Sequence, residues 1–290
     1  MSTLRTRNLT AGMQNLENRC LMAGDVAVSF SGGDLFITGD DLNNRVDIST
    51  VNGQIQVVGN YLNGPTTING QNSPFVINAN AIDDLRVDMN GGSDRLFINN
   101  VHLNNTSHGD MSIDTDGGND LVGVYNSSAR DLNLDTGSDH DDAIVSFSDF
   151  SNDVRIELGS GHDELDLYNV SAEDDIDVAA ESGNDDVAIQ FSSAADDLIV
   201  KLGDGDDVAW INSGNYEDVS LYGENGKDRI TMQYAIVADS LFAHMGAGDD
   251  QLYLYSNSVY GSKYFHGGTG LDKLGASGNN FNAYAYDFSF

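Results

Sequence analysis

The chain of 290 residues has very few cysteines, prolines and long apolar runs. It contains one cysteine, Cys20, and two prolines, Pro65 and Pro74. A single cysteine excludes an internal disulfide framework and a cysteine-rich metal site. No apolar run reaches the length of a membrane-spanning helix, so no transmembrane segment is predicted. A long-lived extracellular protein without disulfides needs another means of stabilisation, and a bound metal is the obvious candidate.

Basic residues are also scarce. Lysine and arginine total 13 against 46 aspartates and glutamates, which gives a formal net charge of −33. Such a surface repels nucleic acid, anionic lipid and polyanionic substrates, and it attracts cations. We therefore expect no nucleic-acid partner. The chain is nevertheless 40% apolar with regular patterning, which argues for a fold rather than disorder.

Related segments follow one another along most of the chain, as GSGHDELDL (159–167) and GAGDDQLYL (246–254) illustrate. Nine copies share an aspartate, and successive aspartates are 21 or 22 residues apart except for a first interval of 26. Self-similarity at a fixed period indicates a repeat architecture. The shared residues are Asp94, Asp120, Asp141, Asp163, Asp185, Asp207, Asp228, Asp250 and Asp272.

The residues around each aspartate predict two strands per repeat. Apolar residues stand two and four positions after it, as Leu165 and Leu167 do after Asp163, which is typical of a strand with one buried face. A second strand with two inward-facing apolar residues precedes each glycine turn. A single coil of this length cannot bury its apolar face alone, whereas stacked coils can. We therefore predict an all-β fold, a right-handed parallel β-helix or β-solenoid of about nine 22-residue coils.

The ends of the chain depart from the repeat. Alternating apolar residues separated by the turn sequences SGGD and VNGQ predict an antiparallel hairpin N-terminal cap. The expected organisation is an N-terminal export-type or disordered segment (1–24), an antiparallel β cap with an irregular first coil (25–78), the solenoid repeats (79–280) and a C-terminal cap strand (281–290).

The stacked aspartates pose an electrostatic problem. Carboxylates about 4.8 Å apart would repel by about 3.5 kcal/mol per pair at an effective dielectric constant of about 20. A calcium ion between successive turns would relieve this repulsion, because carboxylates and turn carbonyls supply the oxygen ligands that calcium prefers. Alternatively, each side chain accepts backbone N–H bonds from its own turn and is purely structural.

A family resemblance supports the calcium hypothesis. The segment GGTGLDKLG (267–275) has the pattern Gly-Gly-x-Gly-x-Asp-x-apolar-x at every position, and the other copies match it in part. The repeats resemble the haemolysin-type, or RTX, calcium-binding repeats, in which calcium lies between turns. The resemblance implies Ca²⁺ as cofactor and the nine shared aspartates as metal ligands. The coil here is longer than that of the family and has glycines at one edge only, so it implies one column of sites.

A second resemblance concerns the N-terminal region. The segment LENRCLMAG (16–24) is similar to a short segment near the start of large exported proteins of planctomycetes. It implies an extracellular or cell-surface location.

Catalysis is not expected. The basic residues are scattered, and among 46 acidic residues no pair can be singled out for acid–base chemistry. His140 and His162 are one coil apart and either bind a transition metal or are exposed turn residues. The leading hypothesis is a non-catalytic, calcium-binding rod in a structural, surface-layer or adhesive assembly, with self-assembly or a surface glycan as possible partners. The alternatives are a carbohydrate-binding module that uses Phe97, Trp210 and Tyr253, and a polysaccharide-active β-helix enzyme.

Overall fold

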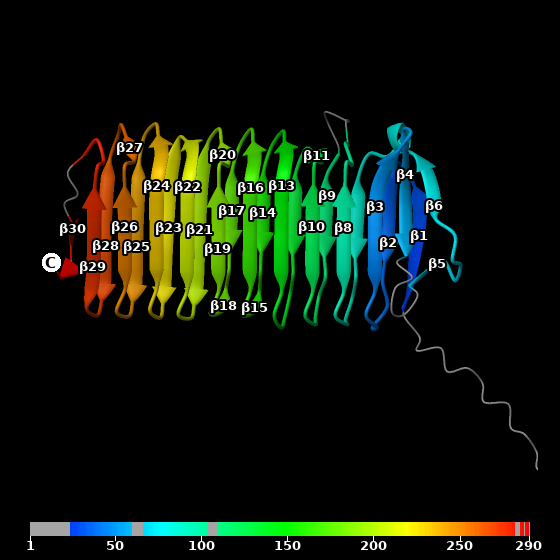
Figure 1. Cartoon of the computed structure of the whole chain (residues 1–290), viewed down its shortest axis with the longest axis horizontal. Helices are drawn as coiled ribbons and strands as arrows, with labels where there is room; N and C mark the ends of the chain where they lie inside the picture. Colours follow the sequence, from blue (N-terminus) through cyan, green and yellow to red (C-terminus); the bar gives the residue numbers. More distant parts are fainter. Residues whose placement is uncertain (1–23, 60–65, 104–108, 282–284, 287, 290) are drawn as a thin grey trace, which may run out of the picture.

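The computed structural model describes residues 24–59, 66–103, 109–281, 285–286 and 288–289. Two long sheets run the length of the molecule, and successive coils contribute a strand to each (Figure 1). Within the described residues the only helical element is the 3₁₀ turn η1 (Ala79–Ala81). The predicted parallel β-solenoid of about nine coils with an antiparallel N-terminal hairpin is therefore confirmed.

The first sheet has 15 strands. They are β1 (Asp25–Ser31), β2 (Asp34–Thr38), β5 (Thr67–Ile68), β7 (Leu85–Asp88), β9 (Met111–Asp114), β12 (Leu132–Asp135), β14 (Val154–Glu157), β15 (Ser160–Gly161), β17 (Ile176–Ala179), β18 (Ser182–Gly183), β21 (Asp197–Asp204), β23 (Asp218–Asn225), β25 (Leu241–Ala247), β28 (Lys263–Thr269) and β30 (Ala285–Tyr286).

The second sheet has 16 strands. They are β3 (Arg45–Val51), β4 (Gln54–Gly59), β6 (Phe75–Asn78), β8 (Arg95–Asn99), β10 (Leu121–Tyr125), β11 (Ser128–Ala129), β13 (Asp142–Phe150), β16 (Glu164–Ala172), β19 (Asp186–Gln190), β20 (Ser193–Ala194), β22 (Val208–Tyr216), β24 (Arg229–Val237), β26 (Gln251–Tyr255), β27 (Ser258–Val259), β29 (Asp272–Ser277) and β31 (Phe288–Ser289).

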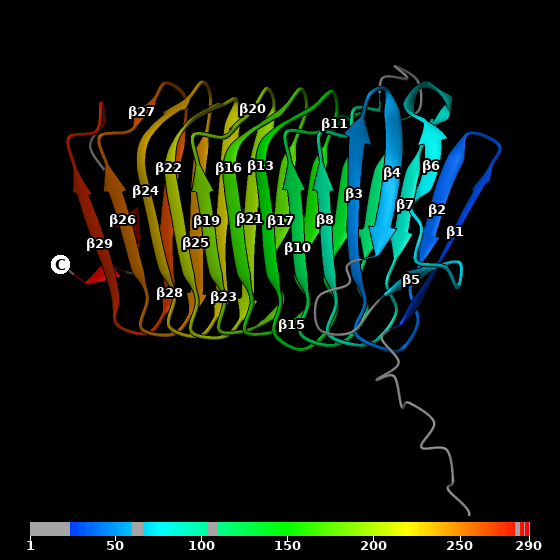
Figure 2. The ribbon, with the colours of Figure 1, turned by 45° about the vertical axis from the view of Figure 1, so that its right-hand side comes forward.

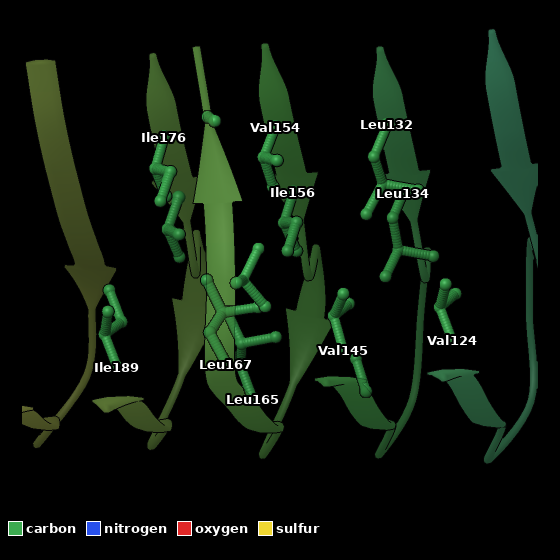
Figure 3. Packing of buried hydrophobic residues seen from close by; sticks show 14 of the residues in the cluster. Val124, Leu132, Leu134, Val145, Val154, Ile156, Leu165, Leu167, Ile176 and Ile189 are labelled. Carbon is green, nitrogen blue, oxygen red and sulfur yellow. The ribbon is translucent and has the colours of Figure 1, made fainter. Parts of the chain in front are cut away.

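The repeat period sets the register between coils. Leu165 of β16 pairs with Ala143 of β13 on one side and with Val187 of β19 on the other, each 22 residues away. Apolar side chains at equivalent positions therefore stack in columns between the two sheets, as Leu132 and Val154 do (Figure 3). These inward-facing residues are almost fully buried, as the alternating sequence pattern predicts.

The N-terminal hairpins are part of the solenoid as well as its cap. β1 and β2 pair antiparallel, and so do β3 and β4 (Figure 2). However, β2 also pairs in parallel with β7, and β3 pairs in parallel with β8. Leu35 and Ile37 are buried in register with Leu85 and Val87, so the stacked core begins well before residue 79.

The C-terminal residues add one two-residue strand to each sheet. β30 pairs with β28 and β31 pairs with β29, both in parallel. The chain thus continues the coil for a last partial turn, where a single cap strand was expected. Residues 1–23 of the expected segment 1–24 lie outside the described residues. In the part of the chain that the structure describes, no helix has the length and apolar character needed to cross a membrane.

The chain bends after the two inward-facing apolar residues of each second-sheet strand, and in every complete coil the residue at this bend has a positive φ. The column consists of Asn100, Asn126, Phe147, Asn169, Phe191, Ser213, Tyr234 and Ser256, with φ between 47° and 62°. Asparagine tolerates this left-handed conformation, whereas a bulky side chain there is a genuine outlier that costs about 1–2 kcal/mol. Three aromatic residues therefore occupy strained positions in this column.

The stacked core predicts a large cost for truncating one inward-facing residue. We expect Leu165→Ala to reduce the free energy of unfolding by about 2–5 kcal/mol, because the fully buried site cannot collapse around the lost atoms. Urea denaturation followed by the circular dichroism of β-structure measures the change. The exposed control Ser151→Ala should stay within about 0.5 kcal/mol of the parent. Equal unfolding midpoints for all three proteins would contradict the assignment of Leu165 to the core.

Candidate metal centre

The structure brings all nine sequence-predicted metal ligands into one column. Each aspartate stands at the end of the glycine turn, just before a strand of the second sheet or, for Asp272, as the first residue of that strand, and each is at most 3% exposed. The column therefore runs inside the rod along one edge. The placement agrees with the expectation of one carboxylate per coil, and metal binding by these residues stays a prediction.

Backbone hydrogen bonds link each carboxylate to the preceding coil. Oδ1 of Asp185 accepts the backbone N–H of Asp163 at 2.8 Å, and Oδ1 of Asp207 accepts that of Asp185 at 2.8 Å. The same bond recurs at every coil boundary of the column. In the first bond the backbone N–H of Asn44 donates to Asp94 at 2.6 Å, and in the last that of Asp250 donates to Asp272 at 3.0 Å. The side chains thus bond across the coil boundary, whereas the structural alternative predicted bonds within a single turn.

The glycines of the turn are required by close stacking. Gly183 has φ of 144°, and a Cβ built on it would lie 1.4 Å from the carbonyl oxygen of Gly161 in the preceding coil. Gly205 and Gly248 have the same relation to the coils before them. No side chain fits at these positions, so glycine allows the turns to approach closely enough for the carboxylate ladder to form.

The second oxygen of these carboxylates is buried without a hydrogen-bond donor among the described residues. It is Oδ2 of Asp94, Asp141, Asp163, Asp185, Asp207, Asp228 and Asp250. A buried carboxylate oxygen without a partner is costly. Each of these coils therefore has a position where a proton or a cation would be stabilising.

Asn44 shows what this position accommodates. It occupies the place of the aspartate in the first coil, because Arg45 pairs with Arg95 and Asn44 donates to Asp94. Its Nδ2 donates to the carbonyl oxygen of Leu42 at 2.6 Å and to that of Asp40 at 3.1 Å. It also donates to Oδ1 of Asp40 at 3.3 Å, so the amide donor lies among two turn carbonyls and one carboxylate oxygen.

The amide nitrogen of Asn44 and the second oxygen of Asp228 occupy equivalent positions. A Cβ on Gly39, five residues before Asn44, would lie 3.0 Å from Nδ2, and a Cβ on Gly223, five residues before Asp228, would lie 2.7 Å from Oδ2. The site next to Oδ2 is therefore suited to a group that carries positive charge. A carboxylate oxygen with turn carbonyls is the donor set of a hard divalent cation, so the residues fit calcium.

The pKa values of the column reflect the same environment. Burial is the main cause and raises the carboxyl pKa, while the backbone hydrogen bond lowers it and neighbouring carboxylates raise it in most coils. The pKa is raised to about 8 for Asp141 and Asp228, to about 7 for Asp94 and Asp185, and to about 6 for Asp120, Asp207 and Asp250. In the absence of a cation, a proton therefore occupies several of these sites near neutral pH.

A second column of aspartates, called the second ladder below, lies along the other edge of the rod. Its hydrogen bonds run in the opposite direction, because the carboxylates that form them accept from the following coil. Oδ1 of Asp175 accepts the backbone N–H of Asp197 in the following coil at 3.0 Å, and Oδ1 of Asp131 accepts that of Asp153 at 3.1 Å. Although burial raises the pKa of Asp84, backbone hydrogen bonds and the adjacent guanidinium of Arg86 lower it overall. The pKa of Asp131 is likewise lowered, chiefly by hydrogen bonds from Asn152 and from the backbone of Asp153, whereas burial raises the pKa of Asp110 and Asp197.

In the part of the chain that the structure describes, arginine ion pairs are found in the N-terminal half of this second ladder. Arg130 contacts Asp110 at 2.7 Å, and Arg155 contacts Asp153 at 2.6 Å. Further along, carboxylates gather in two groups, Asp153, Asp174, Asp175 and Asp175, Asp196, Asp197, and Asp153 of the first group is the partner of Arg155. Sequence reasoning placed no metal site at this edge because its turns lack the glycines of the repeat. The triads are partly exposed secondary positions for a cation.

His140 and His162 extend the glycine-edge ladder. Their rings stack with centroids 4.9 Å apart. Nδ1 of His140 accepts the backbone N–H of His162 at 2.8 Å, and Nδ1 of His162 accepts that of Asn184 at 2.6 Å. Both Nδ1 atoms are therefore occupied by the backbone, which favours the role of exposed turn residues over that of a transition-metal site.

The three aromatic residues considered for carbohydrate binding do not gather. Trp210 and Tyr253 share a column, but Thr231 separates them by a full coil, and Phe97 lies in a distant coil against Tyr125. Exposed aromatic rings do touch one another at the bend of the coil, where Phe147, Tyr168 and Phe191 meet, and these residues were not singled out from the sequence. The strand periodicity ends at this bend, so it does not show which rings meet there.

A shallow hollow over the first sheet is lined by residues that include Ser112, Asp114, Asn133, Asp135, Arg155 and Glu157. The three acidic residues of the hollow stand in register in three successive coils. Burial, with the charge of nearby carboxylates, raises the pKa of Asp114 and Asp135.

Comparisons of the chain with protein-family models, with curated proteins and with solved structures gave no match.

The raised pKa values predict that the metal-free rod is more stable in mild acid than at alkaline pH. The folded state keeps protons that the unfolded state, with a carboxyl pKa of 3.8, has released. Stability is therefore lost as pH rises from about 4 to about 8. With a chelator present, the melting temperature should fall by several degrees between about pH 5 and about pH 8, because about 1 kcal/mol shifts it by roughly 2–4 °C at this size.

A matched pair of variants isolates the column. Asp228→Asn keeps the Oδ1 acceptor but cannot ionise, so its melting temperature should fall less over this pH range. The control Asp175→Asn, on the second edge, should keep the full decrease. A parent melting temperature that is constant or rises over the range would contradict the assignment of protons to the column.

Proposed function

We propose that the chain is a non-catalytic, calcium-binding structural rod that acts outside the cell or at its surface. The observation that carries the proposal is the set of buried aspartate Oδ2 atoms without a donor, at the position where Asn44 places an amide group against turn carbonyls. A calcium ion at each such position would be bound by Oδ2 and by carbonyl oxygens of the glycine turn. It would stabilise the stack of turns against carboxylate repulsion.

Protons and calcium would compete for the same oxygens. Ligand carboxylates must be deprotonated, so a site with a raised pKa binds calcium weakly in acid and more strongly as pH rises. Calcium would then supply stability in the pH range where the metal-free column loses it. This coupling suits a protein in surroundings where free calcium is abundant, as outside cells, where modules with modest affinity are occupied.

Shape and charge support the structural role. The parallel stack forms an elongated body with two continuous sheets, and its net charge of −33 disfavours close association of copies unless cations lie between them. Calcium along the exposed acidic triads of the second edge would reduce this repulsion. Self-assembly into a surface layer or matrix is therefore proposed to depend on calcium.

The calcium response should depend on pH. Ions that bind only the folded state raise the melting temperature by mass action, so we expect calcium to raise it, and to raise it more at about pH 8 than at about pH 5. Calorimetric titration in two buffers of different ionisation enthalpy should show protons released as calcium binds. A melting temperature that does not respond to calcium at either pH, with no heat of binding, would contradict calcium binding.

Two double variants locate the ions. Asp207→Asn with Asp250→Asn should lose part of the calcium response, because each substitution removes one ligand charge from the column. The control Asp175→Asn with Asp197→Asn changes the same number of charges at the second edge and should keep most of the response. If instead the second-edge variant lost the response and the column variant kept it, the stabilising ions would lie at the second edge and not in the buried column.

A further inference from the structure

A ridge of aromatic side chains lies at the bend between the second-sheet strands and the following turn. Phe147 and Phe191 are 54% and 51% exposed, and Tyr168 lies between them at 39%. The ring centroids are 5.3 Å apart for Phe147 and Tyr168 and 5.5 Å apart for Tyr168 and Phe191, both edge to face. These three residues, called the aromatic ridge below, come from three successive coils and therefore form a line along the rod axis.

The backbone of the ridge is strained. Phe147 has φ of 51° and Phe191 has φ of 53°, whereas Asn126 and Asn169 occupy the same place in neighbouring coils. Asparagine tolerates the left-handed region and phenylalanine does not. Neither the core nor the aspartate ladder needs an exposed aromatic ring here. Persistent local strain at an exposed position is a feature of binding sites.

A row of polar side chains runs beside the ridge. Two residues after each bend position stand Asp149, Ser171, Ser193 and Asn215, paired in register across four coils. The Ser171 hydroxyl donates to Oδ1 of Asp149 at 2.5 Å. The Ser193 hydroxyl accepts the backbone N–H of Asn215 at 3.0 Å, so hydroxyl, carboxylate and amide groups lie along the length of the ridge.

We propose that the aromatic ridge, together with this polar row, binds a linear uncharged polysaccharide that lies along the rod axis. Sugar rings present C–H faces that pack on aromatic rings and hydroxyl groups that bond to polar side chains, and the two rows supply both. The net charge of −33 disfavours polyanionic glycans, and it also disfavours a second copy of this chain as the occupant. The proposal is independent of calcium binding.

Affinity electrophoresis of the full chain in native gels tests the proposal. The gels contain hydroxyethyl cellulose, galactomannan or dextran as neutral probes, and polygalacturonate as the anionic comparison. We expect at least one neutral polysaccharide to retard the parent and polygalacturonate not to. Phe147→Asn with Phe191→Asn should weaken the retardation about tenfold or more, because aromatic anchors carry most of the binding free energy of such surfaces.

The choice of substitutions separates an effect on binding from an effect on folding. The double variant introduces the residue that other coils already have at the bend, so its melting temperature should equal or exceed that of the parent. Tyr168→Gln follows the same logic, because Gln190 stands at the equivalent place in the next coil, and it should also bind more weakly. The control Tyr234→Asn removes an equally strained, 60% exposed ring outside the ridge and should bind as the parent does.

Three results would overturn the proposal. The first is a parent that no neutral polysaccharide retards. The second is a double variant that is retarded as strongly as the parent. The third is sedimentation equilibrium in which the parent self-associates and the double variant does not, since the ridge would then be a contact between copies.

Discussion

The hydrogen bond from a backbone N–H of one coil to a buried aspartate of the next is the interaction on which the rod depends. It recurs at every coil boundary from Asn44 to Asp272 and fixes where each glycine turn sits on the turn before it. The bond needs a side chain whose acceptor oxygen just reaches the backbone N–H of the preceding coil, and the short side chain of aspartate supplies one. It also leaves a second oxygen in the interior. The demand of that oxygen for a proton or a cation follows from the geometry that holds the coils together.

The carboxylates of the two edges of the rod differ in burial, in pKa and in their charged partners. On the glycine edge the side chains are buried, and burial raises the pKa of carboxyls such as that of Asp228. On the other edge the side chains bond toward the following coil and are partly exposed, and arginines such as Arg130 and Arg155 neutralise the first half of the ladder. A chain with only 13 basic residues cannot neutralise both edges, so cations from solution are the natural complement.

Much of this architecture could be predicted from the sequence because the period and the alternation are both regular. The spacing of the aspartates gave the number of coils, and the apolar residues flanking them gave the buried faces. The parallel register of Leu35 and Ile37 with Leu85 and Val87 could not be predicted, because these two residues lie in a hairpin whose antiparallel partner hides it. The bond across the coil boundary was missed because it depends on the closeness of successive turns. The aromatic ridge was missed because strand periodicity does not extend through a bend with positive φ.

The protonation state of the aspartate column tests the central claim most directly. Carboxyl carbons of aspartate, labelled with ¹³C in the calcium-free protein, can be followed by NMR as pH is raised. The account predicts a set of aspartates that titrate between about pH 6 and pH 8, with Asp141 and Asp228 highest, near pKa values of about 8. Assignment of the two signals would come from their loss in Asp141→Asn and Asp228→Asn. Titration of every aspartate near the ordinary value of about 3.9 would contradict the account.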